Sequence, residues 1–235
     1  MGSLATSLAL GLRQIADGAV LRILLKSLGV TIVVFLVVAT CGWFALDWLL
    51  AWGGLEDGLF AGAGAVRGAV SALLAVIGLW LTWRIVAMAV IQFYADEVVQ
   101  AVEARHYPQQ AEMARDLPFA EQLRNALSAA GRALLANLVA LPFALVLLFT
   151  GAGTFALFLL VNAVLLGREL QDMVWLRHCH AAGDCAPVSR MQRFLLGGVI
   201  AAMLAVPFAN FLAPVLGAAS ATHLVHRNSR NRSNP

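Results

Sequence analysis

Charged side chains are scarce in this sequence of 235 residues, since Asp, Glu, Lys and Arg together make up only 12% of it. Soluble domains carry about 25% charged residues and roughly 45–50% apolar residues. Here 61% of the residues are hydrophobic, and the mean hydropathy is +0.81. This balance excludes a disordered chain, a small disulfide scaffold and an ordinary soluble enzyme. It predicts an integral membrane protein with two or more spans.

The sequence also has no strong excess of one charge, because it contains 16 Lys and Arg residues and 13 Asp and Glu residues. The small basic surplus is typical of loops on the cytoplasmic side of a membrane, and no basic cluster predicts a nucleic-acid partner. The sequence lacks the motifs of zinc peptidases, serine hydrolases, P-loop nucleotide binding and calcium loops. We therefore expect no enzyme, no catalytic residue and no cofactor.

Cysteine is rare, and an odd number of three predicts no disulfide framework. The cysteines are Cys41, Cys179 and Cys185. The His178-Cys179-His180 group with Cys185 fits no standard zinc spacing, so we expect no metal site. Its role stays open, and a metal-dependent membrane enzyme that uses His178 and His180 is the weakest of three functional hypotheses.

The first half of the chain holds two long apolar runs after an amphipathic start. In residues 1–24, apolar side chains recur every three or four positions, which predicts an amphipathic helix on the membrane surface. Residues 27–94 then contain two spans. The first fills an uncharged stretch of about 20 residues, the length that a bilayer core requires, and the second begins near residue 70.

Pro and Gly divide the apolar runs of the second half into shorter pieces. Residues 133–166 and residues 194–226 each predict a helical hairpin with arms of about 13–18 residues. The hairpins either enter the bilayer in part, as re-entrant segments do, or form four tilted and kinked spans. The sequences ALPFA at 140–144 and AVPFA at 205–209 match each other, which supports pairing the two regions, although five residues can also match by chance.

Polar segments separate these runs and set the expected orientation. Residues 95–132 predict a cytoplasmic helical region, residues 167–193 a cytoplasmic linker helix and residues 227–235 a disordered tail, all within one membrane domain. Arginines concentrate in these segments and before the first span, whereas only Arg67 lies between the two spans. By the positive-inside rule, both termini of this all-α, multi-pass protein are then cytoplasmic.

Arg22 and Lys26 stand where the surface helix gives way to the first span, and Gly18 provides a break before them. A helix start exposes unpaired N–H groups and the positive end of the helix dipole, so these residues predict an oxyanion site. The alternative is that both side chains only anchor the helix on the cytoplasmic side.

Other charges have pathway or structural roles. Arg84, within the second span, is a counter-charge for an anion or a side chain that snorkels to the headgroups. Arg168 and Asp172, at i,i+4 spacing, predict a structural ion pair. We interpret the i,i+3 pair His223 and His226 as interfacial, with a metal pair as the alternative. The remaining charges assigned to a pathway or to structure are Asp96, Glu97, Arg168 and Glu169.

Several segments resemble the CysZ-type sulfate permease family, which is grouped with the etoposide-induced 2.4 membrane proteins. The segment FYADEVV at 93–99 is similar to the family's Phe-Ala-Asp-x-Val-x-x-Ala pattern. The segment NAVLLGRE at 162–169 is similar to its Asn-x-x-Leu-x-Gly-Arg-Glu pattern. The last hairpin, which contains Pro207-Phe208 and ends in Ala221-Thr222-His223, also looks similar.

This resemblance implies a bacterial inner-membrane protein with two long spans, two partly penetrating hairpins and homo-oligomeric assembly around a sulfate pathway that feeds cysteine biosynthesis. It also implies an anion site at a Gly-Leu-Arg-like turn before the first long helix. Val20-Leu21-Arg22 is the nearest match here, and Gly18-Ala19 replaces the Pro-Gly that precedes the turn in the family.

These observations lead to two main hypotheses. The first is a permease or channel for a small oxyanion, most of all sulfate, that lies in the lipid bilayer and uses Arg22 as its leading contact. The second is a non-transporting membrane scaffold whose polar region between residues 96 and 132 binds a protein partner or shapes the bilayer.

Overall fold

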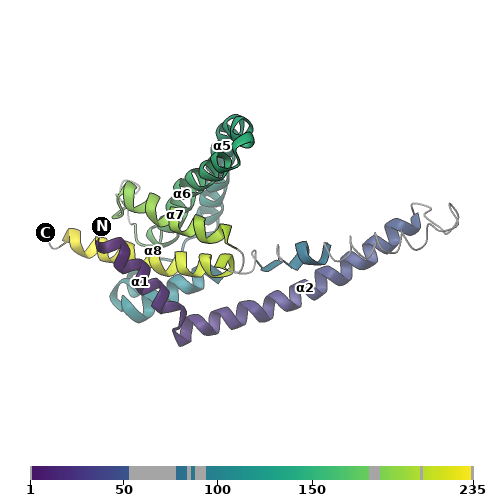
Figure 1. The fold of residues 1–235 in the computed structure, drawn as a ribbon. Coiled ribbons are helices and arrows are strands. Elements are labelled where there is room, and N and C mark those ends of the chain that lie inside the picture. Colours follow the sequence, from purple (N-terminus) through teal and green to yellow (C-terminus); the bar gives the residue numbers. More distant parts are fainter. Residues whose placement is uncertain are drawn as a thin grey trace. The chain divides into compact units, whose positions relative to one another are not determined.

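The structure, a computed structural model, describes residues 2–52, 78–83, 86–87, 94–179, 186–206 and 209–233 (Figure 1). Every regular element among these residues is a helix, which confirms the predicted all-helical fold. The helices are α1 (Gly2–Ile15), α2 (Gly18–Trp52), α4 (Pro108–Met113), α5 (Phe119–Leu147), η1 (Leu148–Thr150), α6 (Ala152–Trp175), α7 (Arg190–Ala205) and α8 (Ala209–Ser233). Residues 94–106 are helical as well.

Three helical stretches among the described residues are long and apolar enough to cross a membrane. They are Gly18–Gly42, Phe119–Thr150 and Ala152–Trp175. Few of the residues in their apolar windows are buried, and none is buried in the window of Phe119–Thr150. A helix that is apolar on all sides and uncovered by protein is stable in lipid rather than in water. The chain is therefore an α-helical membrane protein.

The first hairpin turns at Gly151, between η1 and α6. Gly151 has a φ of +59°, a left-handed conformation that glycine adopts without strain. The Gly153 N–H donates a hydrogen bond to Thr150 Oγ1 at 3.1 Å, which stabilises the turn. The arms are longer than predicted, with 29 residues in α5 and 24 in α6. The reason is that Pro142 lies inside α5 without ending it, and polar residues extend the same helix toward its N-terminus.

The second hairpin region contains α7 and α8. The turn predicted near Pro214 is wrong, because Pro214 lies inside α8 without ending it. A capping box begins α7, because the Gln192 N–H donates to Ser189 Oγ at 3.3 Å and the Ser189 N–H donates to Gln192 Oε1 at 3.1 Å. Helix α8 continues through Ser233, so most of the segment interpreted as a disordered tail is helical. Neither α7 nor α8 is among the candidate spans of the described chain.

The chain divides into two compact units, and α2 passes from one into the other. Unit 1 holds residues 1–23 and 95–235, and unit 2 holds residues 24–94. Within unit 2, the Phe35 and Trp83 rings meet edge to face with centroids 5.4 Å apart, and the Lys26 ammonium lies 4.9 Å from the ring centroid of Tyr94. These contacts join α2 to residues of the second predicted span.

Helix α8 forms the core of unit 1, where it packs against α1, α6 and α7 (Figure 1). Its residues 213–226 are all buried. Small side chains allow this close packing. A Cβ atom on Gly11 of α1 would overlap Ser220 Oγ of α8, so glycine is required where these two helices touch.

Helix α1 turns a narrow stripe of small and polar residues toward α8. The buried residues of α1 are Leu4, Ser7, Gly11 and Gln14. Leu12, by contrast, is 57% exposed. Leucines on the outside of the helix fit the expectation that α1 lies on the membrane surface, because they are free to contact lipid.

Helices α6 and α7 cross at a pair of glycines. A Cβ atom on Gly167 would overlap the backbone carbonyl of Arg193, and a Cβ atom on Gly197 would overlap that of Ala163. The missing side chains let the two backbones approach, as is common where membrane helices pack. This crossing fixes the positions of the charged residues that follow α6.

Candidate functional site

A buried carboxylate lies where three segments of unit 1 meet. Glu103, in the helical segment 94–106, is 1% exposed. Its Oε1 accepts hydrogen bonds from His178 Nε2 at 2.8 Å and from His226 Nε2 at 3.0 Å. Arg177 Nη1 donates to the other oxygen, Oε2, at 3.2 Å. These four residues, which we call the Glu103 cluster, come from segment 94–106, the turn after α6, and α8.

The surroundings keep Glu103 ionised. Burial raises the pKa of its carboxyl group, but the hydrogen bonds from His178 and His226 and the charge of Arg177 together outweigh burial and lower the pKa to about 2. An ionised carboxylate only accepts hydrogen bonds, so both Nε2 atoms carry a hydrogen in this arrangement. Removal of any partner would leave a buried charge with poorer compensation.

Tyr107 connects the Glu103 cluster to a second polar group. Its ring centroid lies 4.7 Å from that of His226, and its hydroxyl group hydrogen-bonds with His223 Nδ1 at 2.9 Å. His106 Nε2 hydrogen-bonds with Gln14 Oε1 of α1 at 2.9 Å. Burial, with a smaller contribution from His106, lowers the pKa of His223 to about 4. His223 is therefore neutral near pH 7.

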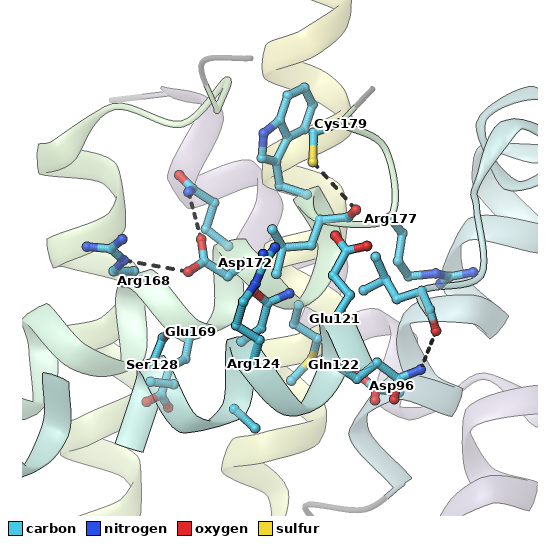
Figure 2. A pocket seen from close by; sticks show the side chains of 18 of the residues that line it. Asp96, Glu121, Gln122, Arg124, Ser128, Arg168, Glu169, Asp172, Arg177 and Cys179 are labelled. Atoms are coloured by element: carbon cyan, nitrogen blue, oxygen red, sulfur yellow. Dashed lines mark hydrogen bonds and ion pairs between the residues drawn. The ribbon is translucent and has the colours of Figure 1, made fainter. Parts of the chain in front are cut away.

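Basic side chains line a cavity of about 1260 Å³ in unit 1. Figure 2 shows side chains of α5, α6 and the turn after α6 around this space. The arginines that line it are Arg115, Arg124, Arg132, Arg168, Arg177 and Arg193. The carboxylates that line it are Asp96, Asp116, Glu121, Glu169 and Asp172. The cavity therefore offers both signs of charge, with a surplus of guanidinium groups.

Some of these charges pair with one another and some do not. Arg168 lies 3.6 Å from Asp172, which confirms the predicted i,i+4 ion pair (Figure 2). Arg132 reaches the same carboxylate at 3.7 Å. Arg124 and Arg193 form no ion pair with any residue that the structure describes. Their guanidinium groups are the best placed to attract an anion into the cavity.

The structure brings together three of the residues assigned to a pathway from the sequence. Asp96, Arg168 and Glu169 all line the cavity. Glu97 belongs to the same helical segment as Asp96 but does not line the cavity. Arg84 lies outside the described residues.

None of the residues of the anion site predicted from the sequence lines the cavity; that site is at the start of α2. Gly18 is the first residue of the helix, and Asp17 Oδ1 accepts a hydrogen bond at 2.9 Å from the amide two residues on. A carboxylate of the chain thus caps this helix start. Leu21 and Arg22 are exposed. Lys26, one turn further along α2, belongs to unit 2.

The sequence did not reveal the Glu103 cluster. His223 and His226 are 1% and 5% exposed, so their interpretation as interfacial residues is wrong. Glu103 lies 123 residues before His226, and local spacing cannot reveal such a contact. The sequence offers one weak sign of the cluster: the carboxylate of Glu103 lies among valines on a helix face that is otherwise apolar. His180 and Cys185 lie outside the described residues.

Three long apolar helices with few buried residues, combined with a charged and histidine-rich core, define an α-helical integral membrane protein of several spans. Residues 7–214 match the family "Sulfate transporter CysZ/Etoposide-induced protein 2.4", and the chain belongs to this family. The resemblance seen in the sequence is thereby confirmed, and the family is of the transporter type rather than an enzyme family. No curated protein and no solved structure gives a significant match to the chain.

Proposed function

We propose that the protein lets a small oxyanion, above all sulfate, pass through the bacterial inner membrane, and that this uptake feeds cysteine biosynthesis. Membership of the transporter family supports this role. The observation that carries the proposal is the arginine-lined cavity, in which Arg124 and Arg193 have no carboxylate partner among the described residues. Guanidinium groups suit oxyanions because their planar N–H donors match two oxygens at once.

In this proposal the anion makes its first contact with Arg22. Gly18 and Leu21 form the turn that presents this side chain, and Lys26 adds a second positive charge one helical turn later. The exposure of Arg22 and the positive end of the α2 dipole support this assignment. Because Asp17 already accepts a hydrogen bond at the helix start, the Arg22 side chain provides more of the attraction than the backbone amides do.

The mixed charges of the cavity then serve passage rather than tight binding. Conduction requires that an ion binds well enough to come in and weakly enough to leave. The carboxylates of Asp96 and Glu169 lie among the arginines and limit the affinity for an anion, while Arg168 contributes attraction. Glu97 and Arg84 stay candidate pathway charges on the basis of the sequence alone.

We further propose that the cavity and both termini face the cytoplasm and that several copies of the chain assemble around the pathway. The positive-inside rule supports the orientation, since most arginines lie in the polar segments. The apolar window of Phe119–Thr150 contains no buried residue. Its surface is therefore open to lipid or to a second copy of the chain, which is compatible with assembly.

Uptake of radiolabelled sulfate into liposomes that contain the purified protein tests the proposal. One charge-assisted hydrogen bond to an oxyanion contributes about 1.5–3 kcal/mol, so Arg22→Ala and Arg193→Ala should each lower the rate at low sulfate roughly 10–100-fold. Arg190→Ala is the matched control, because Arg190 lies on α7 with Arg193 but does not line the cavity. This control should transport sulfate at the wild-type rate.

Two results would count against the proposal. If folded wild-type protein gives only the rate of empty liposomes under several gradients, transport of sulfate is refuted, and the scaffold hypothesis becomes the better one. The next step would then be a search for partners of the polar region between residues 96 and 132. If Arg190→Ala loses as much activity as Arg193→Ala, the effect is one of general charge, and the cavity has no special role.

A further inference from the structure

Three potential metal ligands converge in the Glu103 cluster. Glu103, His178 and His226 each offer one ligand atom, and these atoms all lie within 4.8 Å of one another. The side chains are 1%, 11% and 4% exposed, so bulk water has little access to them. Two histidines and a glutamate are a ligand set that zinc favours, because neutral imidazole nitrogen and carboxylate oxygen are both good zinc donors.

We propose that Glu103, His178 and His226 bind one divalent transition metal ion of the zinc class. None of the three ligands lines the proposed transport cavity, although Arg177, which holds Glu103, does. Zinc bonds of 2.0–2.2 Å in tetrahedral geometry hold ligand atoms about 3.3 Å apart. The histidine nitrogens now lie 2.8 and 3.0 Å from Glu103 Oε1. Each histidine nitrogen therefore needs to separate from Oε1 by about 0.3–0.5 Å, and the two histidine ligand atoms, which lie within 4.8 Å of each other, need to reach the same spacing.

The groups around the ligands also suit a metal. Arg177 donates a hydrogen bond to Oε2 of Glu103, which leaves Oε1 for the ion. A hydrogen bond from a residue that is not itself a ligand orients a carboxylate that binds a metal. The rings of His178 and His226 pack edge to face with centroids 4.9 Å apart, and the ring of Tyr107 also packs on His226. This packing restricts rotation of the two imidazoles.

The same residues can also form a stable cluster with no metal, since Arg177 and two imidazole N–H groups balance the carboxylate. The two states differ at the histidines. Without a metal both Nε2 atoms donate a hydrogen to Glu103, whereas with a metal both Nε2 lone pairs bind the ion and the hydrogens move to Nδ1. Metal binding therefore replaces two hydrogen bonds by three coordinate bonds.

A bound ion would join parts of unit 1 that are far apart in the chain. Glu103 lies 75 residues before His178 and 123 residues before His226. The ion would thus hold segment 94–106 and the turn after α6 against α8. A ligand that binds only the folded state raises stability, so zinc should stabilise the protein against heat.

Metal content is the first test. Purified full-length protein is stripped with a chelator, incubated with zinc, passed through a desalting column and analysed by inductively coupled plasma mass spectrometry. We expect one zinc ion per chain in the wild type, and a loss of affinity of roughly 100-fold or more in Glu103→Gln and His226→Gln. His106→Gln is the matched control, because His106 contacts the neighbouring ring of His223 but is no ligand. Cys179→Ser controls for binding by the half-buried thiol next to His178, and both controls should keep the ion.

The second test uses the wild-type protein alone, so a variant that fails to fold cannot hide the answer. Zinc should raise the thermal unfolding midpoint of the stripped protein, and Co²⁺ in the same site should show the visible absorption of tetrahedral coordination, which zinc then removes. The proposal is overturned if folded wild-type protein retains no zinc and shows no shift of its midpoint. It is equally overturned if zinc persists in His226→Gln and disappears in Cys179→Ser.

Discussion

Replacement of Gly197 by alanine should destabilise the protein at the crossing of α6 and α7. The new Cβ atom would overlap the Ala163 carbonyl oxygen and lie 2.9 Å from the Gly167 Cα atom, so the two helices must move apart. Overpacking of this kind costs about 1–3 kcal/mol, and the higher helix propensity of alanine returns about 0.5–1 kcal/mol. We expect a net loss of about 1–2 kcal/mol, which for a chain of this size lowers the midpoint of thermal unfolding by roughly 2–8 °C.

Gly131→Ala provides the control for this prediction. Gly131 lies in α5, and a Cβ atom there would meet nothing within 4 Å. Only the gain in helix propensity remains, so this variant should be more stable by about 0.5–1 kcal/mol, with a midpoint raised by roughly 1–4 °C. Intrinsic tryptophan fluorescence of both variants and the wild type, heated in the same detergent, measures the two shifts. If Gly197→Ala unfolds at or above the wild-type temperature while Gly131→Ala behaves as expected, the close backbone approach at this crossing is refuted.

Two further predictions concern pH and the start of α2. His223 has a pKa of about 4 in the folded protein against about 6.5 when unfolded, so the unfolded state binds more protons and stability should fall as pH drops from 6.5 to 4, by up to about 3 kcal/mol. His223→Gln should lose less stability over this range in thermal scans from pH 7 to 4, and parallel curves for the two proteins would contradict the burial of a neutral histidine. Asp17→Ala removes the cap of α2 and should cost about 0.5–2 kcal/mol, whereas Asp17→Asn keeps the cap and loses only the ion pair with the exposed Arg105. Equal midpoints for the two Asp17 variants would show that the ion pair, and not the cap, carries the effect.

The helical membrane fold is predictable because it depends on local chemistry. The uncharged run after Ser27 is long enough to cross a bilayer, and it forms the apolar part of α2. The turn of the first hairpin falls at Gly151, inside the Thr150–Gly153 stretch that interrupts an apolar run. Length, apolarity and a glycine that accepts a positive φ are all visible in the sequence itself.

Helix ends are less predictable, because apolarity marks where a helix meets lipid and not where its hydrogen bonds stop. Helix α5 begins at Phe119, within the polar region, and continues past Pro142. Helix α8 likewise continues through a segment rich in Asn, Ser and Arg to Ser233. In both α5 and α8, the polar residues continue the same helix beyond its apolar part.

Contacts between distant segments could not be predicted from spacing at all. Nothing in the periodicity of α1 shows that Ser7 and Gly11, rather than Leu12, face the protein. That choice depends on α8, whose small residues allow close packing. Glu103 and His226 meet for the same reason, because their positions follow from how the helices pack and not from a motif.

The contact between α1 and α8 has a consequence for the order of events during synthesis. Gly11 leaves the ribosome well before Ser220, and at 5–20 residues per second the interval is roughly 10–40 s. During that time the small-residue stripe of α1 has no α8 to pack against, while α2, α5 and α6 are already available for insertion. The core of unit 1 therefore assembles after the apolar helices have been made, and a nascent chain that stops before α8 leaves α1 without its binding surface.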